Sequence, residues 1–89
     1  MDSYRIQWKR SAEKDLRNIA EQYITKILEV VESLSDNPFP GRHRKLYGTK
    51  SSYRIRIGNY RVVYQVNSEK KLIVVFHVRH RKDIYRKLR

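Results

Sequence analysis

The sequence predicts an α+β domain, with helices packed on one face of an antiparallel sheet. An amphipathic helical pattern occupies residues 12–34, and three strand patterns joined by short turns follow it. Strands that come after helices, rather than alternating with them, are typical of this fold class. The chain has 89 residues, which suffice for one domain with a modest core. Residues 1–89 are therefore interpreted as a single domain.

The N-terminal part reads as a short strand followed by helix. Tyr4, Ile6 and Trp8 alternate with polar residues, as in a half-buried strand. Ser11 is a candidate N-cap for the helical segment. Apolar residues then recur at spacings of three and four, at Leu16, Ile19, Ala20, Tyr23, Ile24, Ile27, Leu28, Val31 and Leu34. This periodicity permits either one helix over about 12–34 or a helical hairpin broken near 18–22.

The rest of the chain reads as three strands and a tail. Pro38 and Pro40 end the helical segment, because proline cannot continue a helix. A basic loop is expected after them, and then a hairpin whose strands flank the two-residue turn Gly58-Asn59. A third strand is expected over 71–78, where the continuous apolar character favours a central position in the sheet. The basic tail 81–89 is expected to form a short C-terminal helix.

The two-residue turn fixes the pairing of the hairpin. Arg56 then opposes Arg61, and Arg54 shares their face because side chains alternate along a strand. Like charges directly opposite each other are unfavourable, so this placement indicates that an anion binds between them. The absence of any Asp or Glu from Asn37 to Ser68 strengthens the inference.

The register of the third strand is inferred from Arg79, because an arginine is disfavoured on a core face. The favoured register places His77 and Arg79 on the arginine face, with His77 beside Arg61. The same register assigns Ile73 and Val75 to the arginine face as well. It assigns the apolar face to Leu72, Val74, Phe76 and Val78.

Charge and composition narrow the possible functions. The net charge of +12 favours a polyanionic partner, with nucleic acid first and an acidic protein second. There are no cysteines, and His43, His77 and His80 lack companion ligands, so neither a metal nor a cofactor is expected. No apolar run approaches the length of a membrane span, and the charged N-terminus does not resemble a signal peptide. A cytoplasmic protein is expected.

The candidate functional residues are mainly basic. Arginine matches phosphate oxygens with two parallel hydrogen bonds, so Arg54, Arg56 and Arg61 are candidates for holding a nucleic-acid backbone. His77 and His80 are candidates for proton transfer near neutral pH, and Tyr85 for stacking on a base. An electrostatic fringe that contacts RNA without specificity is expected from Arg42, Arg44, Lys45, Lys50, His80 and Lys82.

Several of these segments together resemble the RelE/ParE toxin superfamily, and its RelE branch most closely. The blocks YRIRIGNYRVVYQV and HRKDIY carry the resemblance, supported by Ala12-Glu-Lys-Asp-Leu16, Asn37-Pro-Phe-Pro-Gly41 and Lys45-Leu46. The resemblance implies a helical hairpin packed on an antiparallel sheet. It also implies a toxin that cuts mRNA in the ribosomal A site and is neutralised by a cognate antitoxin, a class of protein that is usually acidic.

The resemblance also implies roles for individual residues. Arg54 and Arg56 fall on the basic positions of the first hairpin strand, and Arg61 falls on the arginine that opens the next strand. The late arginine falls on Arg79 or Arg81, and the C-terminal tyrosine on Tyr85. The implied reaction is attack of a ribose 2′-hydroxyl on the adjacent phosphate, which leaves a cyclic phosphate and a free 5′-hydroxyl.

One departure from the family concerns the general base. The best-understood RelE enzymes have lysines where this chain has Arg54 and Arg56, and an arginine, unlike a lysine, does not lose its proton in proteins. His77 or His80 is then the candidate base, or catalysis rests on positioning and electrostatics alone. Two other functions are compatible with the sequence: a ParE-type inhibitor of DNA gyrase and a non-catalytic RNA-binding module.

Overall fold

The computed structural model describes residues 3–40 and 52–80 in full and the backbone of 43–45. The helical segment is a hairpin of two helices that are separated near residues 18–20, the second of the two alternatives that the periodicity permits. In chain order, the elements are β1 (Arg5–Trp8), α1 (Arg10–Arg17), α2 (Glu21–Ser33), β2 (His43–Lys45), β3 (Ser52–Ile57), β4 (Tyr60–Asn67) and β5 (Leu72–His80). The expected C-terminal helix over 81–89 lies outside the described residues.

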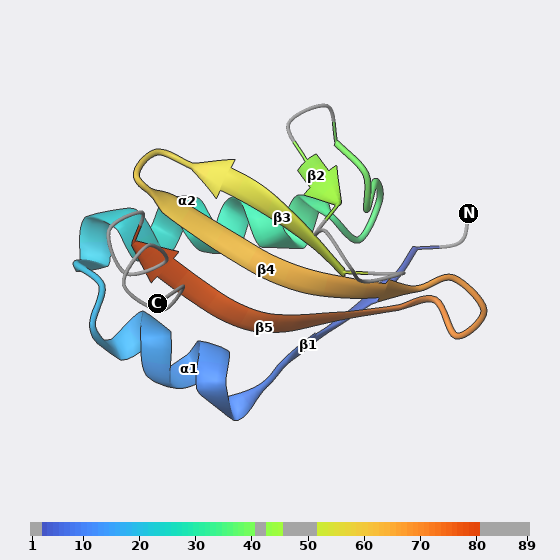
Figure 1. The fold of residues 1–89 in the computed structure, drawn as a ribbon, viewed down its shortest axis with the longest axis horizontal. Coiled ribbons are helices and arrows are strands. Elements are labelled where there is room, and N and C mark those ends of the chain that lie inside the picture. The colour runs from blue at the N-terminus through green and yellow to red at the C-terminus, as the bar shows by residue number, and fades with distance from the viewer. Residues whose placement is uncertain (1–2, 41–42, 46–51, 81–89) are drawn as a thin grey trace.

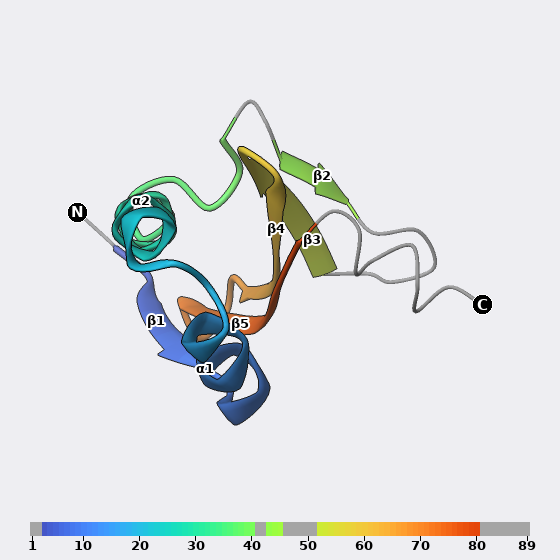
Figure 2. The same cartoon turned by 90° about the vertical axis from the view of Figure 1, so that its left-hand side faces the viewer.

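The strands form one sheet in the order β1-β5-β4-β3-β2 (Figure 1). Strands β2 to β5 pair antiparallel, as predicted, whereas β1 joins the edge of β5 in parallel. The end-on view shows α2 against one face of the curved sheet and α1 beside β5 (Figure 2). The predicted α+β fold class is confirmed, with the refinement that the sheet is mixed because of β1.

The hydrophobic core fills the space between α2 and the sheet. From α2 and its C-terminal end come Ile27, Val31 and Leu34, all fully buried. The core side of the sheet contributes Ile55, Ile57, Val62, Tyr64, Val66, Ile73, Val75 and Val78. Burial of this apolar surface is the main stabilising contribution, and it leaves the opposite face of the sheet to the polar side chains.

Tyr64 ties the segment after α2 to the middle of the sheet. Its side chain is fully buried, and its hydroxyl donates a hydrogen bond of 2.8 Å to the carbonyl oxygen of Pro38. Burial, and to a lesser extent the neighbouring Tyr53, raises the pKa of Tyr64 to about 12. The proline that ends the helical segment is thus also a fixed acceptor for a core hydroxyl.

The pairing predicted for the β3–β4 hairpin is confirmed. Arg56 lies opposite Arg61, Arg54 opposite Val63, and Ile57 opposite Tyr60. Gly58 has a φ of 60°, the left-handed conformation that a two-residue hairpin turn needs and that glycine adopts without steric cost.

The register predicted for β5 is correct in its C-terminal half and wrong in its N-terminal half. An irregularity between Val63 and Tyr64 of β4 places these residues opposite His77 and Val75, so Phe76 is an extra residue on β5. This bulge changes the face to which the strand's alternation points. Ile73 and Val75 are therefore buried with Val78, and the expectation that Leu72, Val74 and Phe76 face the core was wrong.

Ser11 is not the N-cap of the first helix. Helix α1 begins at Arg10, and its cap residue Lys9 makes no side-chain capping hydrogen bond. The Ser11 hydroxyl instead donates a hydrogen bond of 2.6 Å to the carbonyl oxygen of Phe76. Neither helix in the described part of the chain has the length and apolar character needed to cross a membrane.

Candidate nucleic-acid site

Three arginines lie in one row across the sheet. Arg56 of β3 opposes Arg61 of β4, and Arg61 opposes Arg79 of β5. Opposed residues in an antiparallel pair have Cβ atoms about 5 Å apart, so the three side chains start from closely spaced points. We call Arg56, Arg61 and Arg79 the arginine row. Its members repel one another, and a bound anion would remove that repulsion.

A second row lies directly beside the arginine row on the same face. It consists of Arg54 of β3, Val63 of β4 and His77 of β5, again opposed in register. His77 is thus diagonal to Arg61, which confirms the predicted proximity of the two residues. The bulge at Phe76 is what places His77 and Arg79 on this face while Val75 stays in the core.

The Arg56 side chain is hydrogen-bonded to the turn of its own hairpin. Its Nε donates a hydrogen bond of 3.2 Å to the carbonyl oxygen of Gly58, and the residue is exposed. Arg54 and Arg61 are partly buried. Guanidinium groups in this arrangement have the charge and the donor geometry to bind phosphate oxygens bidentately.

Helix α1 completes the edge of β5 where β1 ends. Strand β1 pairs only with residues 72–75 of β5, and the last backbone contact is the Lys9 amide to the carbonyl oxygen of Val75, at 2.9 Å. Beyond this point, Ser11 donates to the Phe76 carbonyl, and Asp15 Oδ2 accepts the Val78 amide at 3.0 Å. Ser11 and Asp15 lie one helical turn apart, so two side chains of α1 take the place of a neighbouring strand.

Asp15 also lies close to two candidate residues at the end of β5. Its Oδ2 lies 3.2 Å from Arg79 Nε and 3.5 Å from His77 Nδ1. The side chains of Asp15 and Arg79 are 15% and 21% exposed, whereas that of His77 is 40% exposed. We call Asp15, His77 and Arg79 the Asp15 cluster. The carboxylate draws the Arg79 side chain toward the sheet edge, so this member of the arginine row is tethered.

Arg79 and His77 are also joined directly. Arg79 Nη2 lies 3.1 Å from His77 Nδ1, at hydrogen-bond distance. Arginine only donates hydrogen bonds, so a hydrogen bond at this contact requires the lone pair of His77 Nδ1. The Nε of Arg79 is buried and, despite its distance of 3.2 Å from Asp15 Oδ2, makes no hydrogen bond in the described structure. The Arg79–Asp15 contact is thus an ion pair with a misaligned N–H group.

His80 lies on the helix side of β5. It opposes Tyr60, whose row faces the helices, and the two rings meet edge to face with centroids 5.2 Å apart. His80 lines a hollow of about 300 Å³ together with Asp15, Asn18, Ile19, Tyr60, Val78 and Arg79. Of the two histidines proposed as proton-transfer groups, only His77 is on the arginine face.

The remaining predicted residues are only partly described. In β2, Arg44 is the register partner of Arg54, and Lys45 is that of Tyr53. Arg42, Lys50, Arg81, Lys82 and Tyr85 lie outside the described residues. Within residues 3–40 and 52–80, no three His, Asp or Glu side chains converge as metal ligands would.

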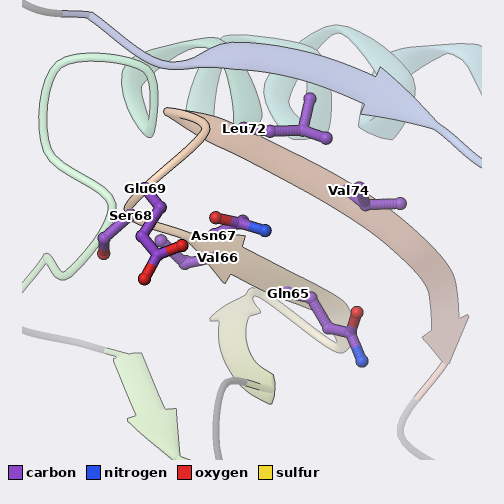
Figure 3. Close-up of a pocket in the computed structure, with 7 residues that line it drawn as sticks. All are labelled: Gln65, Val66, Asn67, Ser68, Glu69, Leu72 and Val74. Carbon is purple, nitrogen blue, oxygen red and sulfur yellow. The ribbon is translucent and has the colours of Figure 1, made fainter.

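Another hollow lies away from these residues, at the other end of β4 and β5. It has a volume of about 470 Å³, and its lining residues are drawn in Figure 3: Gln65, Val66, Asn67, Ser68, Glu69, Leu72 and Val74. Its lining contains Glu69 but no member of the arginine row or the Asp15 cluster. The candidate site is accordingly the open arginine face and not this hollow.

The sequence could not identify Asp15 as part of the site. The hydrogen bond between Asp15 and the Val78 amide spans 63 residues, and no local pattern links the two positions. In the sequence, Asp15 fits the ordinary place of a carboxylate in the first turns of a helix. Only the packing of α1 against the free edge of β5 gives it this second role.

Comparisons with known proteins place the chain in a family. Residues 6–85 match the family model described as the ParE toxin of type II toxin–antitoxin system, parDE. The chain is 32% identical over 76 residues to RelE1 of Methanocaldococcus jannaschii, covering 82% of this chain and 84% of that protein. It is 33% identical over 89 residues to toxin RelG of Mycobacterium tuberculosis, covering 94% and 98% of the two chains.

A solved structure agrees with these relatives. The archaeal RelE–RelB complex from Pyrococcus horikoshii OT3 contains a chain that superposes with a TM-score of 0.79 at 31% identity, covering 89% of this chain and 96% of that one. The family model carries the ParE name, whereas the relatives and this structure carry RelE names. This chain therefore belongs to the RelE/ParE superfamily and is a RelE-family toxin of a type II toxin–antitoxin system.

Proposed function

We propose that this toxin is an endoribonuclease that cleaves mRNA on the ribosome. The observation that carries the proposal is the arginine row with His77 beside it, on the face of the sheet opposite the core. Three guanidinium groups in register match the charge of a phosphodiester, and a histidine diagonal to the middle one is suited to proton transfer. Neither a deep pocket nor a metal ion is needed for this chemistry.

The proposed reaction is transesterification within the RNA chain. The ribose 2′-hydroxyl attacks the adjacent phosphorus, the bond to the 5′-oxygen breaks, and a 2′,3′-cyclic phosphate and a 5′-hydroxyl result. Arg61 and either Arg79 or Arg81 would stabilise the extra negative charge of the pentavalent phosphate, while Arg54 and Arg56 would hold the flanking backbone. Tyr85 would stack on a nucleotide, as the family resemblance implies.

His77 is the better placed of the two candidate bases. It lies diagonal to Arg61 on the arginine face, whereas His80 opposes Tyr60 on the helix side. A general base must come within hydrogen-bond reach of the proton that it removes, and a phosphate held by the arginine row lies on the His77 side of the sheet.

We also propose that an acidic antitoxin binds and neutralises this toxin. The Pyrococcus horikoshii relative was solved as a complex with RelB. The net charge of +12 favours association with an acidic chain by long-range attraction.

The alternative is inhibition of DNA gyrase, and the name of the matching family model favours it. Fold does not separate the two targets. Brief induction of the toxin followed by mapping of mRNA 5′ ends tests both. New 5′ ends inside translated codons support cleavage, whereas a DNA-damage response with intact message supports the gyrase alternative. Salt-dependent RNA binding with neither effect would indicate a non-catalytic RNA-binding module.

A matched pair of variants connects the outcome to the arginine face. We expect Arg61→Ala to abolish the new 5′ ends and the growth arrest. Arg17→Ala removes the same charge from an exposed position of α1 and should leave both unchanged. Full toxicity of the triple alanine variant of Arg54, Arg56 and Arg61 would rule the proposal out.

A further inference from the structure

We propose that Arg79 and Asp15 compete for the Nδ1 atom of His77 and thereby determine which tautomer it adopts. With Arg79 on Nδ1, His77 cannot serve as a base. Once a phosphate draws Arg79 away, Asp15 acts as the positioning residue that makes His77 a base. The inference rests on the proposed ribonuclease function, but its main readout is a proton position that can be measured without cleavage.

The contact between Arg79 and His77 favours the inactive tautomer of His77. Arg79 Nη2 lies 3.1 Å from Nδ1, and since the guanidinium has no acceptor, Nδ1 must offer its lone pair. A neutral imidazole then carries its hydrogen on Nε2. Neither ring nitrogen of His77 has a lone pair left to accept the proton of a 2′-hydroxyl in this state.

Asp15 is already in place for the active tautomer. Its Oδ2 lies 3.5 Å from His77 Nδ1 and is held there by the Val78 amide, at 3.0 Å. The carboxylate lies on α1 and is largely buried, so it has little freedom to turn away. When Arg79 leaves Nδ1, the ring hydrogen can move to Nδ1 and be donated to Asp15, which leaves the lone pair on Nε2.

A phosphate has the chemistry to make Arg79 leave. Arg79 opposes Arg61 across β4 and β5, so an anion bound at Arg61 lies within the same row. The existing partner is a poorly aligned one, because the buried Nε makes no hydrogen bond to the carboxylate 3.2 Å away. A phosphate would instead accept two parallel hydrogen bonds from the guanidinium.

Among the described residues, the charged groups around His77 come from four elements. They are Asp15 on α1, Arg79 on β5 itself, Arg61 diagonally across on β4, and Arg54 on β3 in the row that contains His77. Only Asp15 is negative, so it is the one group in this set that can accept the Nδ1 hydrogen.

Every proton in the proposed cleavage step has a donor and an acceptor. His77 Nε2 takes the proton of the 2′-hydroxyl as the O2′–phosphorus bond forms, and Nδ1–H remains bonded to Asp15. The bond from phosphorus to O5′ breaks, and the leaving oxygen takes a proton from water or from the His77 imidazolium. Loss of that proton returns His77 to neutrality, and Arg79 can bind Nδ1 again when the cyclic phosphate departs.

The test reads the His77 tautomer by ¹⁵N NMR of the imidazole ring in the free toxin at pH 8. We expect Nε2–H in the unliganded protein and Nδ1–H in Arg79→Met, which needs no ligand. We expect the wild type to convert to Nδ1–H on saturation with a 2′-deoxy trinucleotide, which lacks the attacking hydroxyl. Binding of this probe is followed separately through the backbone amides of Arg56 and Arg61.

The Asp15→Asn variant distinguishes the role of Asp15 in orienting His77 from its role in holding the edge of β5. The side-chain carbonyl of the new asparagine can still accept the hydrogen bond from the Val78 amide, so the helix and the sheet edge are retained. The neutral amide is a weaker acceptor for the His77 Nδ1 hydrogen than the carboxylate, so it stabilises the Nδ1–H tautomer less. We expect the bound probe to leave His77 as Nε2–H and RNA cleavage to fall about 100-fold in kcat with little change in KM. Glu13→Gln, which alters an exposed carboxylate on the same helix, is the control and should behave as the wild type.

Two results would overturn the inference. One is an Nε2–H tautomer in Arg79→Met, because removal of the competitor would then not release Nδ1. The other is bound probe with no change of tautomer in the wild type. Absence of mRNA cleavage in cells would instead count against the proposed function and leave the tautomer measurements as they stand.

Discussion

Arg61 lies directly opposite Arg79 across β4 and β5, and on its other side it lies opposite Arg56. The middle arginine is therefore flanked by like charges on both neighbouring strands. Opposed like charges destabilise a sheet, so this row lowers the stability of the free toxin. Such a cost is expected at sites where function and stability conflict.

Arg61→Gln is expected to stabilise the free toxin while removing its activity. Each relieved pair contributes about 0.2–1 kcal/mol, so the free energy of unfolding should rise by about 1 kcal/mol at low salt. Denaturant unfolding at about 20 mM and about 500 mM salt measures the effect, and the gain should shrink at high salt because salt screens exposed charges. A loss of stability that is the same at both salt concentrations would contradict this account.

Binding of single-stranded RNA should depend on salt in proportion to the arginines that contact phosphate. The slope of log affinity against log salt changes by about 0.7 for each phosphate that the protein no longer neutralises. Replacing Arg54, Arg56 and Arg61 with alanine should therefore reduce the slope by about 2. Fluorescence anisotropy with a labelled oligonucleotide measures it over about 50–300 mM salt.

The control for this slope removes the same charge from the helix. The exposed residues Arg10, Lys14 and Arg17 of α1 are replaced with alanine in one variant. We expect this variant to weaken binding by less and to change the slope by less than about 1. Equal slopes for the two triple variants would show that RNA responds to net charge and not to the arginine face.

Tyr64→Phe is expected to destabilise the toxin at neutral pH. The substitution removes the 2.8 Å hydrogen bond to Pro38 and leaves that carbonyl oxygen without its buried partner. The expected loss is about 1–3 kcal/mol in the free energy of unfolding. Circular dichroism in urea at pH 7 measures it, and an unchanged midpoint would mean that water replaces the hydroxyl.

The same residue makes stability depend on alkaline pH. An unfolded tyrosine loses its proton near pH 10, whereas the folded Tyr64 has a pKa of about 12. The folded state therefore binds more protons between these values, and its stabilisation is complete below pH 10 and lost as the pH rises through 12. The wild type should lose about 2–3 kcal/mol over this window relative to Tyr64→Phe. If the free energy of unfolding falls equally with pH in the two proteins, the pH dependence does not come from Tyr64.

Ser11→Ala should loosen the edge of β5 near the bulge. The variant leaves the Phe76 carbonyl without the hydroxyl that donates to it at 2.6 Å. We expect a loss of about 1 kcal/mol in the free energy of unfolding and faster hydrogen exchange at the Val78 amide. Ser11→Thr retains the hydroxyl and should recover most of the loss. If exchange increases equally in both variants, the hydroxyl is not the cause.

The hairpin could be predicted in full because its register is a local property. The turn Gly58-Asn59 fixes the pairs from Tyr53 to Tyr64, and the structure has those pairs. The helical stripe was equally readable, but its periodicity left open one helix or a hairpin broken near residues 18–22, and the family resemblance implied the hairpin. The strand pairing and the helical stripe depend only on neighbouring residues.

The bulge and the Asp15 cluster could not be predicted because they depend on distant packing. Strict alternation cannot bury Val75 and Val78 on the same face, and only the fit of both side chains to the core favours an extra residue between them. The direction of β1 likewise follows from the path of the helical hairpin. Asp15 becomes a site residue only after α1 reaches the edge of β5.

The extra residue at Phe76 gives β5 two segments that can change independently. Before it, substitutions of Ile73 and Val75 must fit the core, and after it, His77 and Arg79 lie on the arginine face. New side chains at these two positions would alter the open face without repacking Ile73 or Val75. The strand thus offers a place to change the proposed RNA contacts while the core residues stay the same.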